Sequence, residues 1–151
     1  MTRSVDWAEC RAPSLAEVET LAEAAFAALP EAFRRLCQGV VIRVVDFPDD
    51  ETFEEMGLES PFDLLGLFRG VGLAQGGFAD GLQTGQFPNM VWLYRRPLLD
   101  YWSEHEETLG ALVTHVLVHE IGHHVGLSDE DMARIESRAD DEPPKPGDRT
   151  A

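Results

Sequence analysis

The spacing of apolar and polar residues in the first forty positions predicts helices. Apolar residues recur every three or four positions from 15 to 29, which is the period of a helix that buries one face. Ser14 can cap this helix, and Glu17, three residues later, can reach back to complete a capping box. Pro30 interrupts the helix or begins a second one, which Gly39 ends.

Three shorter apolar runs predict β-strands. Residues 40–47 are β-branched and nearly all apolar, so we expect a buried strand there. Residues 63–70 and 89–96 predict two further strands. The connection between these two, residues 71–88, is rich in glycine. Connections of this length without regular structure are uncommon in compact domains and are often functional.

A long apolar helix is predicted from 103 to 126. Ser103 can cap it, glutamates follow near its positive end, and Gly126 is suited to ending it. A short helix over 129–139 follows. Residues 140–151 are polar and rich in proline, so we expect a disordered tail. The whole chain of 151 residues has the length of one domain.

Composition and charge narrow the class of partner. Apolar residues make up 44% of the chain, which is enough for a folded core. The chain has 28 acidic residues against 12 lysines and arginines, for a formal net charge of −16. A surface this acidic repels phosphate backbones and anionic lipid, so we expect neither a nucleic acid nor a membrane as partner.

The sequence favours a cytoplasmic location. No stretch approaches the roughly 18 apolar residues that a membrane span needs. The N-terminus lacks the basic and apolar regions of a signal peptide. Cys10 and Cys37 are the only cysteines, so no disulfide framework is expected and both thiols should be reduced.

The candidate chemistry lies in the long predicted helix, at His119-Glu120-Ile121-Gly122-His123. Residues four apart share one helix face, so the two imidazoles can bind one metal ion, and Zn²⁺ suits them. Glu120 is offset from His119 by about 100° and can take a proton from a metal-bound water without binding the metal itself. The pattern predicts a zinc-dependent hydrolase. The alternative is a helix whose histidines are only packed or solvated.

Two histidines leave a catalytic zinc site incomplete, because such sites normally have three protein ligands and a water. Gly126 can adopt a left-handed conformation and turn the chain, which would return Asp129 toward the metal. Asp129 is therefore the predicted third ligand. Two alternatives stay open: Asp129 caps the last helix, or Glu136 on that helix supplies the ligand.

Three segments resemble the small bacterial zincin-like metallopeptidases, also called minimal metalloprotease-like proteins. They read DLLGLFRG, VWLYRRPLL and LVTHVLVHEIGHHVGLSDEDM, and the resemblance spans about residues 40–136. The last segment carries the pattern HExxHxxGxxD, which ends at Asp129. The resemblance implies a compact α+β, zincin-like domain over 1–139, with a small mixed sheet packed on the active-site helix.

The resemblance also implies chemistry and a kind of substrate. It implies zinc bound by His119 and His123, a catalytic Glu120, and hydrolysis of a peptide or protein that the family does not specify further. Zincin-type peptidases commonly lay substrate along an edge strand beside this helix, by strand addition. By this resemblance we place strand 91–94 near the metal, and the alternative is an interior strand with both neighbours paired. A different class, a metal-bearing binding or regulatory module with little turnover, is the second hypothesis.

Several nearby side chains have more than one possible role. His115 is expected to be a core histidine rather than a partner of the site. Tyr94 and Tyr101 can steady an oxyanion, although packing is the favoured role for both. Arg95 and Arg96 can hold a substrate carboxylate, although surface ion pairs are favoured.

Overall fold

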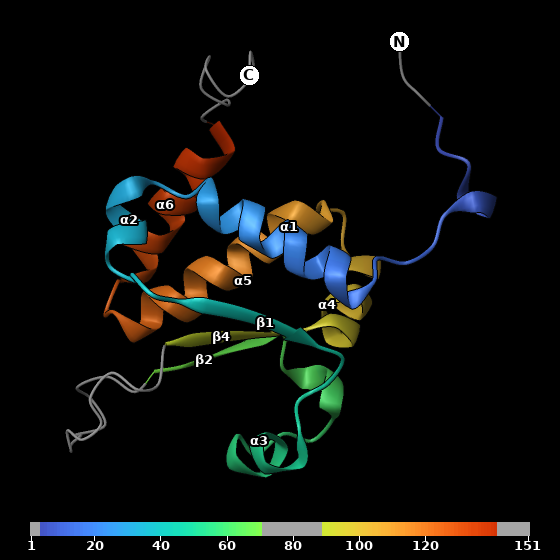
Figure 1. Ribbon diagram of the computed structural model, residues 1–151, viewed down its shortest axis with the longest axis horizontal. Helices are drawn as coiled ribbons and strands as arrows, with labels where there is room; N and C mark the ends of the chain where they lie inside the picture. Colours follow the sequence, from blue (N-terminus) through green and yellow to red (C-terminus); the bar gives the residue numbers. More distant parts are fainter. Residues whose placement is uncertain (1–3, 71–88, 142–151) are drawn as a thin grey trace.

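A three-stranded sheet lies at the centre of the fold, in a computed structural model that describes residues 4–70 and 89–141 (Figure 1). Strand β1 (Val41–Val45) runs parallel to β4 (Met90–Tyr94), and β2 (Gly66–Arg69) runs antiparallel to β4 on its other side. The sheet is therefore mixed and small, as expected, and the α+β class is confirmed.

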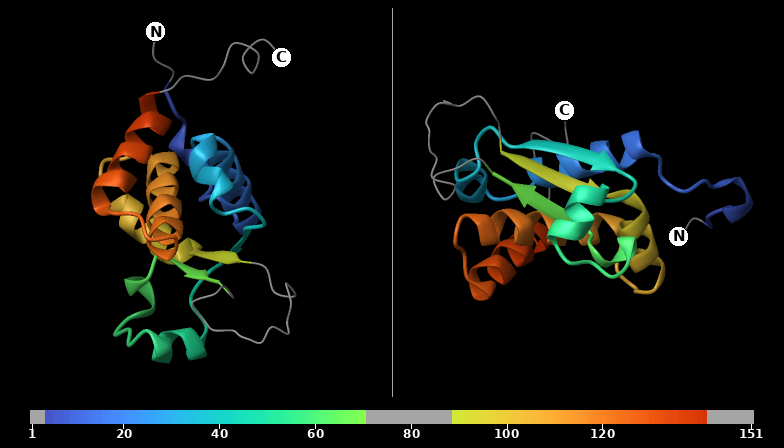
Figure 2. Two further views of the ribbon diagram at one scale, coloured as in Figure 1. Left: turned by 90° about the vertical axis from the view of Figure 1, so that its left-hand side faces the viewer. Right: turned by 90° about the horizontal axis from the view of Figure 1, so that it is seen from below.

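Six α-helices accompany the sheet in the described part of the chain. They are α1 (Leu15–Ala27), α2 (Glu31–Arg35), α3 (Asp50–Glu55), α4 (Arg95–Ser103), α5 (Leu109–His124) and α6 (Asp129–Asp141), and two 3-10 turns are η1 (Trp7–Glu9) and η2 (Pro61–Asp63). Helices α1 and α5 lie over one face of the sheet, and α6 lies beside α5, while α3 lies beyond the opposite face (Figure 2).

The core lies between the sheet and the two helices that cover it. Val91 and Leu93 of β4 are fully buried, two residues apart, and so point to the same face of the sheet. Helix α5 contributes most of the opposing side chains: Leu112, Val113, Val116, Leu117, Val118 and Ile121. Val18 and Ala22 of α1 complete this layer. Because α5 is buried along this face, its position relative to the sheet is well determined by packing.

The first helices form where the spacing predicts them. The Ser14 hydroxyl accepts a hydrogen bond from the Glu17 backbone N–H at 3.1 Å, and the Glu17 carboxylate accepts one from the Ser14 N–H at 2.8 Å. This is the complete capping box. Pro30 precedes α2, and Gly39 has a φ of 79°, which suits a glycine after a helix.

The helix predicted from 103 to 126 forms but begins later than expected, because α5 spans Leu109–His124 and Ser103 is the last residue of α4. Helix α4 ends at Ser103, whose hydroxyl donates to the Asp100 carbonyl, so Ser103 does not cap the next helix. Thr108 caps α5 instead, and its hydroxyl oxygen accepts the Ala111 N–H at 3.0 Å. The hydroxyl of Thr108, which lies closer to the apolar run than Ser103 does, thus caps the start of α5.

The strand positions differ from two expectations. β4 is the central strand, with β1 and β2 hydrogen-bonded on either side. Residues 91–94 therefore form an interior strand, the alternative that the sequence left open, and the prediction that a peptide docks along this strand is wrong. Among the described strands β1 has β4 as its one neighbour, and only Ile42 in it is buried, so the prediction of a buried strand over 40–47 is also wrong. An apolar run alone does not distinguish central from edge strands.

Parts of two predicted segments lie outside the described residues. The glycine-rich connection 71–88 is one of them. Helix α6 continues to Asp141, so residues 140 and 141 are helical, and the remainder of the predicted tail, 142–151, is not described. Within the described ranges, no helix combines the length and apolar character needed to cross a membrane.

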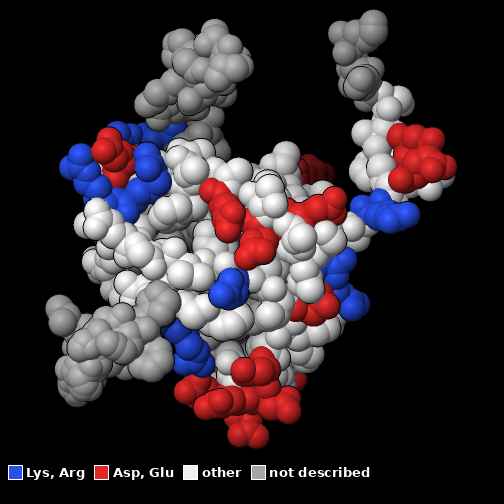
Figure 3. Space-filling view, viewed as in Figure 1, with Lys and Arg blue, Asp and Glu red and all other residues white. Residues whose placement is uncertain are grey.

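Acidic side chains gather at one end of the molecule (Figure 3), where Figure 1 places α3. This helix has the sequence DETFEE and follows a further carboxylate at Asp49. Because α3 lies across the sheet from α5 and α6, its carboxylates lie away from the histidines of α5.

Candidate metal centre

Helix α5 carries three histidines in one line along its surface. His115, His119 and His123 are four residues apart and therefore lie on one face, one turn after another. The ring centroids of His115 and His119 are 4.1 Å apart, and those of His119 and His123 are 5.8 Å apart with the rings nearly perpendicular. The helix thus presents a row of imidazole nitrogens rather than isolated rings.

The histidine row is at the surface, next to α6. The side chains of His115, His119 and His123 are 50%, 27% and 62% exposed. The prediction that His115 is a core histidine is therefore wrong. The core is filled from the other face of α5, so the His115 imidazole can present a nitrogen to a metal ion.

Helix α6 reaches the histidines through a sharp turn and a close packing contact. Gly126 has a φ of 85°, and the Leu127 N–H donates to the Gly122 carbonyl at 2.8 Å. Met132 is fully buried, and its Cγ would lie 2.8 Å from a Cβ placed on Gly122. Because a Cβ at position 122 would force Met132 to shift, the glycine there lets α6 approach α5 closely.

Glu136 of α6 bridges two of the three histidines. One carboxylate oxygen lies 2.9 Å from His115 Nδ1, and the other lies 2.9 Å from His119 Nε2. Within residues 4–70 and 89–141, these three side chains form the group whose possible metal-binding atoms all lie within 4.8 Å of one another. Two imidazoles and one carboxylate are a donor set that zinc uses in proteins.

The residues of the predicted zinc site, His119, His123 and Asp129, are less closely grouped. His119 and His123 are adjacent on α5, and Asp129 Oδ1 lies 3.9 Å from His123 Nε2. The Asp129 side chain is 93% exposed. Asp129 does not cap α6, because the Ser128 hydroxyl accepts the Asp131 N–H at 3.0 Å and takes that role. The carboxylate of Asp129 is therefore available, although it is not in contact with the histidine.

Glu120 lies on a different side of α5, facing β2. Its carboxylate accepts a hydrogen bond from the Phe68 backbone N–H, and burial raises the pKa of this carboxyl above its usual value. The His123 charge and the Phe68 hydrogen bond oppose this rise in the pKa. Since β2 pairs with β4 through its other edge, this N–H lies on the edge of β2 that no strand within residues 4–70 and 89–141 pairs with. Glu120 is thus a half-buried carboxylate between the helix and the sheet edge.

Aromatic and glycine contacts bring β2 against the motif. The Phe68 ring stacks on His124, with centroids 4.0 Å apart. A Cβ on Gly66 would lie 2.7 Å from a methyl group of Val116, and one on Gly70 would lie 2.7 Å from the His124 ring. These contacts hold the strand edge next to Glu120. The motif alone contained no indication of Phe68, because its contact depends on how α5 crosses the sheet.

The remaining polar candidates have mainly structural contacts. Arg95 pairs with Asp46 at 3.0 Å and donates to the Pro13 carbonyl at 2.6 Å. Tyr101 stacks on His105, with centroids 3.8 Å apart. Tyr94 is buried, which raises the pKa of its hydroxyl to about 12.

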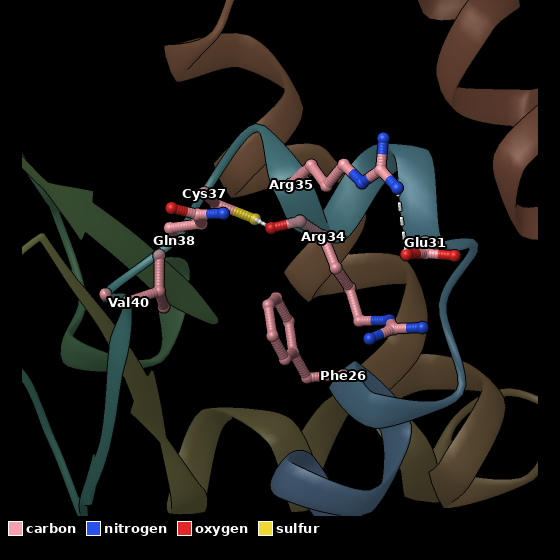
Figure 4. A pocket seen from close by; sticks show the side chains of 8 residues that line it. Phe26, Glu31, Arg34, Arg35, Cys37, Gln38 and Val40 are labelled. Atoms are coloured by element: carbon pink, nitrogen blue, oxygen red, sulfur yellow. Dashed lines mark hydrogen bonds and ion pairs between the residues drawn. The ribbon is translucent and has the colours of Figure 1, made fainter.

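A surface pocket of about 370 Å³ lies elsewhere, around the end of α2 (Figure 4). Figure 4 shows Cys37 beside Arg34 and Val40, and an Arg35–Glu31 ion pair at 3.1 Å. Burial raises the pKa of the Cys37 thiol to about 11, so little reactive thiolate is present near neutral pH. The histidine row on α5 therefore offers the stronger chemistry.

The chain belongs to the zincin-like metallopeptidase family, whose model matches residues 37–139. The matched span contains the whole of α5 and its histidine row. Among solved structures, the chain is similar to a conserved hypothetical protein from Thermo thermophilus, with 27% identity over 76% of this chain and 92% of that chain, and a TM-score of 0.45. The search of curated proteins found no match.

Proposed function

We propose that this protein is a zinc-dependent metallohydrolase that cleaves peptide bonds, with Glu120 as the residue that transfers protons. The observation that carries the proposal is the position of Glu120. This carboxylate is near enough to His123 for the histidine's charge to lower its pKa, and it accepts the Phe68 N–H of β2, in a chain that belongs to the zincin-like family.

We assign the zinc to His119, His123 and Asp129, which together we call the motif site. The donor types fit, because two imidazoles and one carboxylate are used in catalytic zinc sites. Asp129 has no competing role as a helix cap, and its oxygen lies 3.9 Å from His123. Glu136 is the rival third ligand, because its carboxylate already touches His119.

The protein's own residues account for the proton transfers in this mechanism. When bound, zinc polarises the scissile carbonyl and lowers the pKa of a coordinated water to about 7. Glu120 accepts a proton from the attacking water and delivers it to the leaving amine. Its half-buried position keeps the carboxylate from being fully solvated, which makes it a stronger base.

We propose a peptide or protein as the substrate, bound along the outer edge of β2. Only one edge of β2 is paired within the described sheet, and the Phe68 N–H points from the other edge to Glu120. A peptide added there would form backbone hydrogen bonds beside the histidines. Nucleic acid and membrane partners are not part of this proposal, and the cytoplasm remains the proposed location.

Metal analysis and a peptide-library screen test this function. The purified full-length chain, after incubation with zinc, should hold about one ion, in line with a single catalytic zinc site. It should also cleave library peptides, and Glu120→Gln should not. Glu130→Gln is the matched control, because Glu130 is an exposed carboxylate at the start of α6. A folded protein that takes up no zinc would contradict the proposal.

A metal-binding regulatory module with little turnover is the second candidate. The observation that favours it is the contact between Glu136 and His119, which forms a metal-capable group without Glu120. In that case wild-type protein and Glu120→Gln would bind zinc equally, and neither would cleave any peptide in the library.

A further inference from the structure

His119 takes part in two different groups of possible metal ligands. Toward the C-terminal end of α5 it forms the motif site with His123 and Asp129. Toward the N-terminal end it lies beside His115, and Glu136 spans the two imidazoles at 2.9 Å on each side. The second group is the more compact, with its candidate ligand atoms within 4.8 Å of one another.

We infer that His115, His119 and Glu136 form a second position for a divalent transition metal, which competes with the motif site for His119. We call it the upstream site. The inference rests on the proposed function only for the existence of the competing site. The upstream site itself rests on the contacts of Glu136 with His115 and His119.

The donors and their geometry suit a zinc-like ion. Ligand atoms of a tetrahedral zinc site with bonds of about 2.0–2.1 Å are roughly 3.4 Å apart. The two 2.9 Å contacts would need to open by a few tenths of an ångström, which small rotations of the exposed His115 and the partly buried His119 imidazole can supply. The mix of imidazole and carboxylate also suits Co²⁺ and Ni²⁺.

Helix α6 holds the Glu136 carboxylate in place before any ion binds. Met132, one turn before Glu136, is fully buried against Gly122. Ile135 also packs on the core. Glu136 itself is only 23% exposed. An ion at the upstream site would therefore meet a carboxylate that loses little conformational freedom on binding.

The two sites exclude each other, because His119 offers one lone pair at Nε2. They also differ in their distance from Glu120. From the helical rise, Glu120 is about 4.5 Å along the axis from the midpoint of His115 and His119, but only about 1.5 Å from that of His119 and His123. An ion at the upstream site thus lies away from the proton-transfer residue, and this form of the protein would be inactive.

Removing the motif ligands isolates the upstream site for measurement. Co²⁺ is titrated into metal-free, full-length His123→Ala/Asp129→Ala, and bound cobalt is followed by its visible spectrum. We expect one Co²⁺ per chain. Adding Glu136→Gln should weaken binding by more than about 100-fold, because a bond to the metal is lost rather than an outer contact. Adding Glu130→Gln instead should leave the affinity unchanged.

The result that overturns the inference is a His123→Ala/Asp129→Ala protein that is folded by circular dichroism and binds no Co²⁺. Binding that persists unchanged in the Glu136→Gln triple variant would also overturn it. Neither result affects the proposed function, which depends on zinc and turnover in the wild-type chain. Conversely, wild-type protein without peptidase activity would leave the upstream site standing if the double variant binds Co²⁺.

Discussion

The two turns of α5 on either side of His119 differ in how a carboxylate reaches them. In the earlier turn, Glu136 already touches both imidazoles and is largely covered. In the later turn, Asp129 lies 3.9 Å from His123 and is 93% exposed. Glu136 follows the buried Met132 along α6, whereas Asp129 is the first residue of that helix, next to the turn. The packing of α6 therefore places a carboxylate firmly beside the earlier turn, from His115 to His119, which does not contain Glu120.

This difference suggests a division of roles along a single helix. Glu136, whose carboxylate is held by the packing of α6, gives a compact site. Asp129, whose carboxylate lies next to the chain turn at Gly126, gives an adjustable one. Catalytic zinc needs an open coordination position and a neighbouring base. The later turn meets both needs, since Glu120 lies beside it and its acid partner is exposed.

The largest effect is expected at the residue that both turns share. His119→Ala removes a ligand from the motif site and from the upstream site at once. Metal affinity should fall by more than about 100-fold, and peptide cleavage should disappear with it. Zinc titration of the purified variant measures this. His105→Ala, which changes a histidine outside the row, should bind zinc as the wild type does.

A large effect confined to the later turn is expected from Asp129→Ala. In a Glu136→Gln background, which removes the upstream carboxylate, this change should lower zinc affinity by more than about 100-fold. Thermal unfolding should change little, because Ser128 caps the helix. If zinc affinity is unchanged by Asp129→Ala but is already lost in Glu136→Gln alone, the third ligand is Glu136.

An intermediate effect is expected from filling the contact between the helices. A Cβ at position 122 would lie 2.8 Å from Met132 Cγ, so Gly122→Ala should destabilise the fold by about 1–3 kcal/mol. Gly110→Ala is the control, since a Cβ there would lie 4.0 Å from Leu21 Cδ1, an ordinary contact. It should be neutral or stabilising by up to about 1 kcal/mol. Denaturant unfolding measures both variants, and equal losses of stability would contradict this account of α6.

The smallest effect is expected from the helix cap. Ser128→Ala removes the acceptor of the Asp131 N–H and should cost about 0.5–2 kcal/mol of stability. Ser137→Ala, at an exposed position in the same helix, should stay within about 0.5 kcal/mol of the wild type. Because the cap adjoins Asp129, Ser128→Ala should weaken zinc binding at the motif site more than Co²⁺ binding at the upstream site.

Local sequence signals predicted the family and the α+β class, and both are confirmed. Ser14 and Glu17 form the capping box that their spacing predicts, and Gly126 makes the turn that its position suggests. These features depend on residues within a few positions of one another, so a single sequence contains the information.

Features that depend on distant segments were not predictable in the same way. The central place of β4 depends on which strands pair with it, and an apolar pattern does not specify partners. The core position predicted for His115 is wrong because helix packing turns its side chain outward to Glu136, 21 residues away. The contact of Phe68 with Glu120 likewise depends on the crossing of α5 over β2.

The central claim is that Glu120 performs proton transfer beside a zinc ion held by the motif histidines. The most direct test measures kcat/KM for one cleaved library peptide, together with zinc content, in the same preparations of wild-type protein and Glu120→Gln. We expect equal zinc content and a kcat/KM lower by about 10²–10⁴-fold in the variant. Equal kcat/KM in two preparations with equal zinc content would contradict the claim.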